Sequence, residues 1–72
     1  KADGLDDAII GIAMSFGRPD VLCYDVKKIV SILVSRDGMS EDEAYEFFDY
    51  NILGSYNGEG MPVFLTESHD EY

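Results

Sequence analysis

Alternating apolar and small residues near the start of the chain predict a strand at residues 8–14. The stretch is short and rich in β-branched side chains, which favours a strand over a helix. Counted with a period of two, one of its faces is strongly apolar, and we expect that face to be buried. It carries Ile10, Ile12, Met14 and Phe16. Gly11, on the small opposite face, indicates a bulge or a close backbone approach.

The next segment predicts a turn and a second strand. Gly17, Pro19 and their neighbours at residues 17–20 interrupt the apolar pattern, and Val21 to Tyr24 is a second short apolar run. Residues 8–24 therefore predict a hairpin with a rather long loop.

Helical spacing begins directly after this hairpin. Apolar residues recur at i, i+3, i+4 and i+7, at positions Val26, Ile29, Val30 and Leu33. Asp25 precedes them, and its carboxylate can accept hydrogen bonds from the first free amides of a helix. Arg36 and Gly38 are typical of the helix end.

A capping box predicts the start of a second helix at Ser40 to Glu43, because each side chain can bond to the other residue's amide. Ala44, Phe47 and Phe48 define its expected buried face, and Asn51 falls on the same side. Gly54 is the natural terminator of this helix.

A third strand is predicted at Met61 to Leu65, with Pro62 at its start or on a sheet edge. The order β-β-α-α-β predicts an α+β fold, with a small three-stranded antiparallel sheet and two helices packed on one face. We expect the third strand to lie beside the first. The chain of 72 residues forms a single small domain, with a folded core at 6–65 and flexible ends at 1–5 and 66–72.

Charge is distributed very unevenly along this pattern. Residues 1–36 carry five acids and five bases, whereas residues 37–72 carry ten acids and no base, which accounts for the whole net charge of −10. This asymmetry favours a protein partner with a basic surface and argues against direct binding to nucleic acid or to an anionic membrane.

The acids of the second predicted helix gather on one side of it. At 100° per residue, Asp42, Glu46 and Asp49 fall within about 60° of each other, opposite the expected buried face. Tyr45 and Tyr50 flank them on either side. Two interpretations remain open: a solvated helix face, or a partner-binding site at Asp42, Tyr45, Glu46, Asp49 and Tyr50.

Other chemistry has little support in the sequence. His69 lies in the predicted tail and Cys23 in a strand, so neither a cysteine–histidine pair nor a zinc set is expected. The acids at residues 3–7 lack the ligand spacing of a calcium loop, and residues 57–60 predict a turn and no phosphate site. We therefore expect no enzyme activity, no cofactor and no metal. No apolar stretch approaches the roughly 18 residues of a membrane span.

Several segments together resemble a family of short, uncharacterised acidic proteins encoded by bacteriophages and prophages. These are Asp-Asp-Ala-Ile-Ile-Gly at 6–11, Leu-Cys-Tyr-Asp at 22–25, Gly-Met-Ser-x-x-Glu-Ala at 38–44 and Pro-Val-Phe at 62–64. The resemblance covers most of residues 6–65. It brings no established activity, and it implies a cytoplasmic setting in a bacterial host cell.

Two functions compete on this reading. The first is a small acidic, non-enzymatic protein-binding module, with a phage-encoded inhibitor or DNA mimic as a special case. The alternative is a structural, self-associating component of a viral or bacterial assembly, since an exposed sheet edge can pair with another copy. A hydrolase that uses the acidic cluster with a divalent metal is the weakest idea. Sensitivity to salt and the size of the protein in solution separate the first two.

Overall fold

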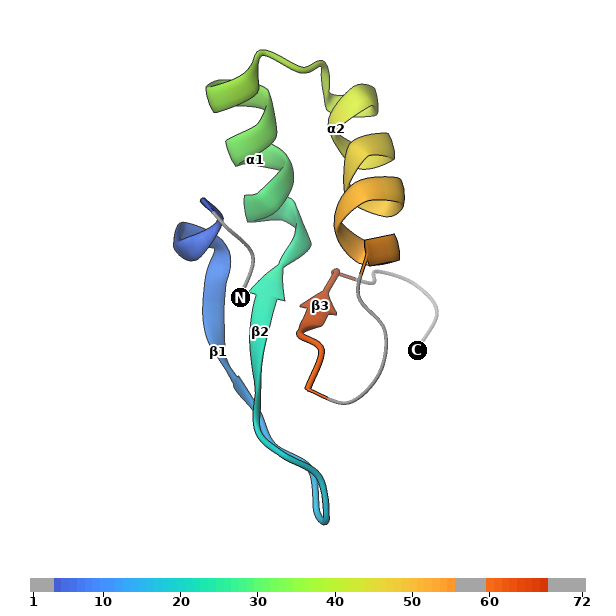
Figure 1. Cartoon of the computed structure of the whole chain (residues 1–72). Helices are drawn as coiled ribbons and strands as arrows, with labels where there is room; N and C mark the ends of the chain where they lie inside the picture. The colour runs from blue at the N-terminus through green and yellow to red at the C-terminus, as the bar shows by residue number, and fades with distance from the viewer. Residues whose placement is uncertain (1–3, 56–59, 68–72) are drawn as a thin grey trace.

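The predicted hairpin is present in the computed structural model, which describes residues 4–55 and 60–67 (Figure 1). Strand β1 (Ile9–Ala13) pairs antiparallel with strand β2 (Val21–Asp25). The register shifts between Ile9 and Gly11, so the bulge that Gly11 indicated is confirmed. A 3-10 turn at Asp6–Ala8 leads into β1.

The buried face of β1 is not the one that we expected. The four predicted core residues are 43, 56, 76 and 105% exposed, in the order Ile10, Ile12, Met14, Phe16. Ile9 packs on the core instead, opposite the fully buried Tyr24. The period of two does hold along β1, but the half-buried set is Ile9, Gly11 and Ala13, so the side with the smaller side chains faces the core. The far half of the hairpin also extends beyond both helices (Figure 1).

Helix α1 (Val26–Asp37) follows the prediction closely, since all four residues of its apolar stripe are buried. Gly38 ends it in the left-handed conformation at φ 72°, where glycine is favoured, and its amide donates to the Leu33 carbonyl. The expected cap by the Asp25 side chain is wrong, because that side chain makes no capping hydrogen bond. Asp25 still belongs to β2, where its side chain alternates with the inward-facing Tyr24.

Helix α2 (Glu41–Phe47) begins with the capping box that the sequence predicted. The Ser40 amide donates to Glu43 Oε1 at 2.9 Å, and the Glu43 amide donates to Ser40 Oγ at 3.1 Å. The helix continues as a π turn at Phe48–Ile52 and a 3-10 turn at Leu53–Ser55.

The π turn changes which side chains of this segment are buried. Ala44, Phe48 and Ile52, spaced by four, face the core, whereas Phe47 is 36% exposed and Asn51 is exposed. The burial predicted for Phe47 and Asn51 is therefore wrong. A π turn holds more residues than an α turn, so positions four apart stay on one face.

The sheet is mixed, with the strand order β1-β2-β3. Strand β3 (Val63–Leu65) pairs parallel with β2, so the fully antiparallel sheet and the place beside β1 that we predicted are both wrong. The reason lies in the connection: α1 continues in the direction of β2, and α2 runs back (Figure 1). The chain thus returns to the end where β2 began and enters β3 in the same direction. Pro62 precedes the strand, as expected.

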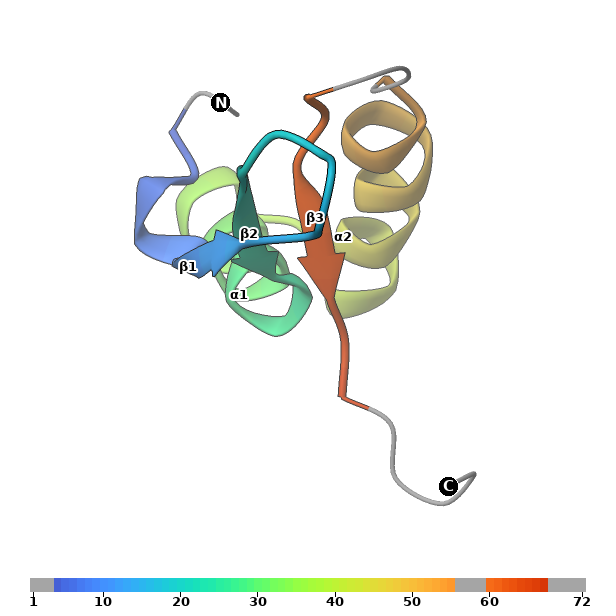
Figure 2. The same cartoon turned by 90° about the horizontal axis from the view of Figure 1, so that it is seen from below.

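Both helices contribute to one core with the inner side of the sheet, and they lie beside β2 and β3 in the view of Figure 2. Leu5 is buried in it, so the folded core begins earlier than residue 6. Nearby, the Arg36 guanidinium donates to the Gly4 carbonyl at 3.0 Å. The turn expected at Asn57 and the chain ends at 1–3 and 68–72 lie outside the described residues.

Removal of the cap should destabilise the fold measurably. We expect Ser40→Ala to lower the free energy of unfolding by about 1 kcal/mol, because the Glu43 amide loses its acceptor. Urea unfolding followed by circular dichroism measures this. Ser31→Ala, at an exposed position within α1, is the matched control and should be neutral or slightly stabilising. Equal losses in the two variants would contradict a special role for the cap.

The capping box should also make stability depend on pH. Hydrogen bonds from Ser40, that of its amide first, lower the pKa of the Glu43 carboxyl below its ordinary value of 4.5. The contribution is therefore complete above that value and is lost as the pH falls through the lowered pKa of the folded state. Glu43→Gln should have a lower free energy of unfolding than the wild type at pH 7. The difference in this free energy between the two proteins should become smaller in acid. Glu41→Gln is the control, since it removes one charge and leaves this hydrogen bond in place. Urea unfolding should show that its free energy of unfolding, relative to the wild type, changes less with pH than that of Glu43→Gln.

Candidate functional site

The predicted partner-binding residues all lie at the surface of α2 and the π turn that follows it. We call the group Asp42, Tyr45, Glu46, Asp49 and Tyr50 the acidic face; each of its members is exposed, Tyr50 to 78%. The structure places them as a continuous feature of one helical segment, with the buried residues of that segment on its other side.

The carboxylates of the acidic face are not neutralised within the described part of the chain. The two ion pairs found there are Lys27–Glu67, with 3.5 Å between Nζ and Oε1, and Arg36–Asp37, with 2.9 Å between Nε and Oδ1. In the second pair, the hydrogen bond from the guanidinium lowers the pKa of the Asp37 carboxyl. Neither pair includes Asp42, Glu46 or Asp49, so these charges face solvent.

Each tyrosine of the acidic face lines a different shallow hollow. Tyr45 lines one of about 360 Å³ between the helices, together with Lys27, Lys28 and Glu41 among others. Tyr50 lines the other, of about 300 Å³, on a different side of α2. The two tyrosines therefore lie beside different hollows of the surface.

The second hollow adds a residue that the sequence interpretation missed. Phe47 lines it with Glu43, Glu46 and Tyr50, and so places an exposed aromatic ring against the acids. We predicted that Phe47 was buried because a spacing of 3.6 was assumed throughout the helix. The signal that could have corrected this was Ile52, which continues a buried row at spacing four.

The helix dipole accounts for only part of the acidic face. Carboxylates in the first turn of a helix are stabilised by its positive end, and Glu41, Asp42 and Glu43 occupy that turn. The effect falls off within one turn, so it provides no reason for Glu46 and Asp49. The exposure of these two acids fits a solvated helix face as well as a partner-binding site.

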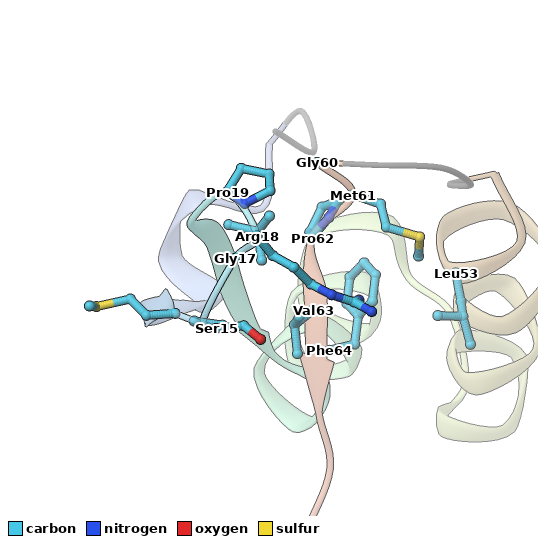
Figure 3. Close-up of a pocket in the computed structure, with 13 residues that line it drawn as sticks. Ser15, Gly17, Arg18, Pro19, Leu53, Gly60, Met61, Pro62, Val63 and Phe64 are labelled. Carbon is cyan, nitrogen blue, oxygen red and sulfur yellow. The ribbon is translucent and has the colours of Figure 1, made fainter.

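A larger groove lies between the hairpin turn, β3 and the end of the second helical segment. Its volume is about 880 Å³, and Figure 3 shows Arg18 and Pro19 of the turn on one side, Pro62 to Phe64 beneath them and Leu53 opposite. Among the described residues, its lining is mostly apolar and includes no acid, histidine or cysteine. This composition suits contact with an apolar group, and the groove shares no residue with the acidic face.

Groups that could support other chemistry are sparse in the residues described. No three histidine, cysteine or acidic side chains among them are arranged to hold a metal ion. Cys23 is a half-buried free thiol in β2, and His69 lies outside the described residues. No described helix is long and apolar enough to cross a membrane.

The chain was compared with protein-family models, with curated proteins and with solved structures, and none of them matches it. A function for this protein must therefore be argued from its own surface. The resemblance to phage-encoded proteins stays a prediction.

Alanine substitutions can test that Phe48 is the buried phenylalanine of this segment and Phe47 the exposed one. We expect Phe48→Ala to cost about 3–5 kcal/mol, because its ring is 5% exposed and contacts Phe64, and this would unfold most of a domain of this size. Phe47→Ala should cost less than about 1 kcal/mol. Thermal and urea unfolding of the pair provide the comparison. A larger loss of stability in Phe47→Ala than in Phe48→Ala would contradict the burial of Phe48 that the structure shows.

Proposed function

We propose that this protein is a small, non-enzymatic binding module that engages the basic surface of another protein through its acidic face. The observation that carries the proposal is the exposure of three carboxylates, unpaired within the described residues, on one helical segment flanked by tyrosines. Two of these carboxylates, those of Glu46 and Asp49, lie beyond the reach of the helix dipole.

Each component of the acidic face has a use in such a complex. Unpaired surface carboxylates attract a basic partner over distance and speed its association, and they lose little solvation until contact is made. Tyr45 and Tyr50, together with the adjacent Phe47, add rigid aromatic area beside the charges, and aromatic side chains of this type carry much of the energy at protein interfaces. The hollows beside the tyrosines can accept side chains of the partner.

DNA mimicry is the most specific form of this proposal. Five exposed acids occupy residues 41–49 of the helical segment: Glu41, Asp42, Glu43, Glu46 and Asp49. At about 1.5 Å per residue they span about 12 Å, or one charge per about 3 Å. A DNA strand carries one phosphate per about 3.4 Å of axis, so the linear charge densities are comparable. A protein that normally binds nucleic acid is thus the partner class that we propose, in the cytoplasm of a phage-infected bacterium, a setting taken from the resemblance alone.

Charge reversal with a matched control tests the proposal. Immobilised wild type is incubated with bacterial lysate at low and high salt, beside the triple variant Asp42→Lys, Glu46→Lys, Asp49→Lys. The control variant, Asp7→Lys, Asp20→Lys, Glu67→Lys, changes the net charge equally at exposed positions outside the acidic face. Of the ion pairs among the described residues, it disrupts only the surface pair Lys27–Glu67, which is worth little. Circular dichroism confirms that each variant is folded.

We expect a partner that wild type and control retain at low salt and that the acidic-face variant binds at least about tenfold more weakly. If the acidic face acts as a DNA mimic, duplex DNA should displace the protein from this partner, and high salt should release it. Binding that is unchanged in the acidic-face variant, or reduced equally in both variants, would mean that the face is merely solvated.

A further inference from the structure

The hairpin carries an exposed apolar surface that neither the core nor the acidic face uses. Its four large side chains, Ile10, Ile12, Met14 and Phe16, lie within seven residues, and the Phe16 side chain is as exposed as in an unfolded chain. Single exposed apolar residues are ordinary on protein surfaces, but a cluster on one element marks an interaction site.

Strand β1 is also an open edge of the sheet. Among the described strands it pairs with β2 alone, so the backbone amides and carbonyls of its other side point outward. Edge strands are usually protected by charged residues or proline, and Ile9–Ala13 contains neither. The bulge near Ile10 is its one protective feature, and the pairing is regular again from Gly11 to Ala13.

The charge distribution indicates which partner this edge suits. Residues 9–25 carry Arg18, Asp20 and Asp25, a net charge of −1, while the whole chain carries −10. A strongly charged partner would find little to bind there. A second copy of the chain would meet an almost neutral surface, provided that the two acidic faces stay apart.

The sheet order keeps those faces apart. Strand β1 lies at one edge of the sheet and α2 lies beside the other, next to β3 (Figures 1 and 2). If two copies meet at β1, five strand spacings of about 4.8 Å separate β3 from its counterpart, or about 24 Å. This exceeds the Debye length of about 8 Å at physiological salt, so repulsion between the acidic faces is largely screened.

We propose that two copies of this protein pair antiparallel through β1 and form a continuous six-stranded sheet. A register centred on Ile12 places this residue opposite its own copy and Ile10 opposite Met14 of the second chain. The same surface then serves both partners, as a twofold dimer requires. This inference does not depend on the acidic face, so either proposal can fail without the other.

Sedimentation equilibrium over about a hundredfold range of protein concentration tests the dimer. The wild type should dimerise, and Ile12→Lys should weaken the dimer by at least about tenfold, because it places like charges opposite each other. The matched control is Leu65→Lys, at a residue of β3 with nearly the same exposure (52%, against 56% for Ile12), and it should dimerise normally. A wild type that is monomeric throughout, or an equal effect of the two lysines, would overturn the proposal and leave the edge to a different protein.

Cross-linking tests the pairing itself. In a Cys23→Ser background, Ile12→Cys should form a disulfide-linked dimer on mild oxidation, since opposed residues of antiparallel strands lie within about 4.5–5.5 Å, a separation that a disulfide spans. Leu65→Cys in the same background should remain uncross-linked. A dimer that persists without cross-linking at residue 12 would overturn the pairing through β1.

Discussion

Packing between three aromatic rings joins β2, β3 and the second helical segment. Tyr24 of β2 stacks on Phe64 of β3 at 5.7 Å between ring centroids, and Phe64 meets the edge of Phe48 at 5.2 Å. Strand β3 is three residues long and can form few ladder hydrogen bonds, so its side-chain packing must provide much of its attachment. Phe48, at the other end of the row, fixes the rotation of the second helical segment. The exposure of Glu46, Asp49 and Tyr50 therefore depends on a row of rings on the opposite side of the same segment.

Features that depend on a few neighbouring residues could be predicted from the sequence. The capping box at Ser40, the apolar stripe of α1, the left-handed Gly38 and the bulge beside Gly11 are all present. The acidic face belongs with them, because the exposure of one side of a helix follows when the other side is buried. Two kinds of feature could not be predicted: the rotation of side chains around a helix whose turns are not all of the α type, and the pairing of segments that lie far apart in the sequence. The π turn moved Phe47 and Asn51 to the surface, and the direction of β3 was set by how the two helices fold back on each other.

Ile10 and Ile12 belong to an apolar surface that the core leaves exposed. Their alternation correctly marked an apolar surface, but the sequence does not distinguish a surface buried within one chain from a surface suited to another copy. The structure makes that distinction through the position of α1 and α2, which cover Tyr24 and leave the far half of the hairpin open. The result is a molecule with its charge beside one sheet edge and its exposed apolar residues along the other.

The parallel pairing of β2 with β3 also has a consequence for how the chain folds. Cys23 and Val63 are 40 positions apart, whereas Ala13 and Val21 of the hairpin are 8 apart. The longer closure costs about 1.5 kcal/mol more chain entropy, so we expect the hairpin and helices to form before β3 joins them. Synthesis on the ribosome imposes the same order, since residues 63–65 emerge last of the three strands. Until they do, the five-residue β2 forms an open sheet edge that β3 later covers, and the protein is most prone to mispair there during that interval.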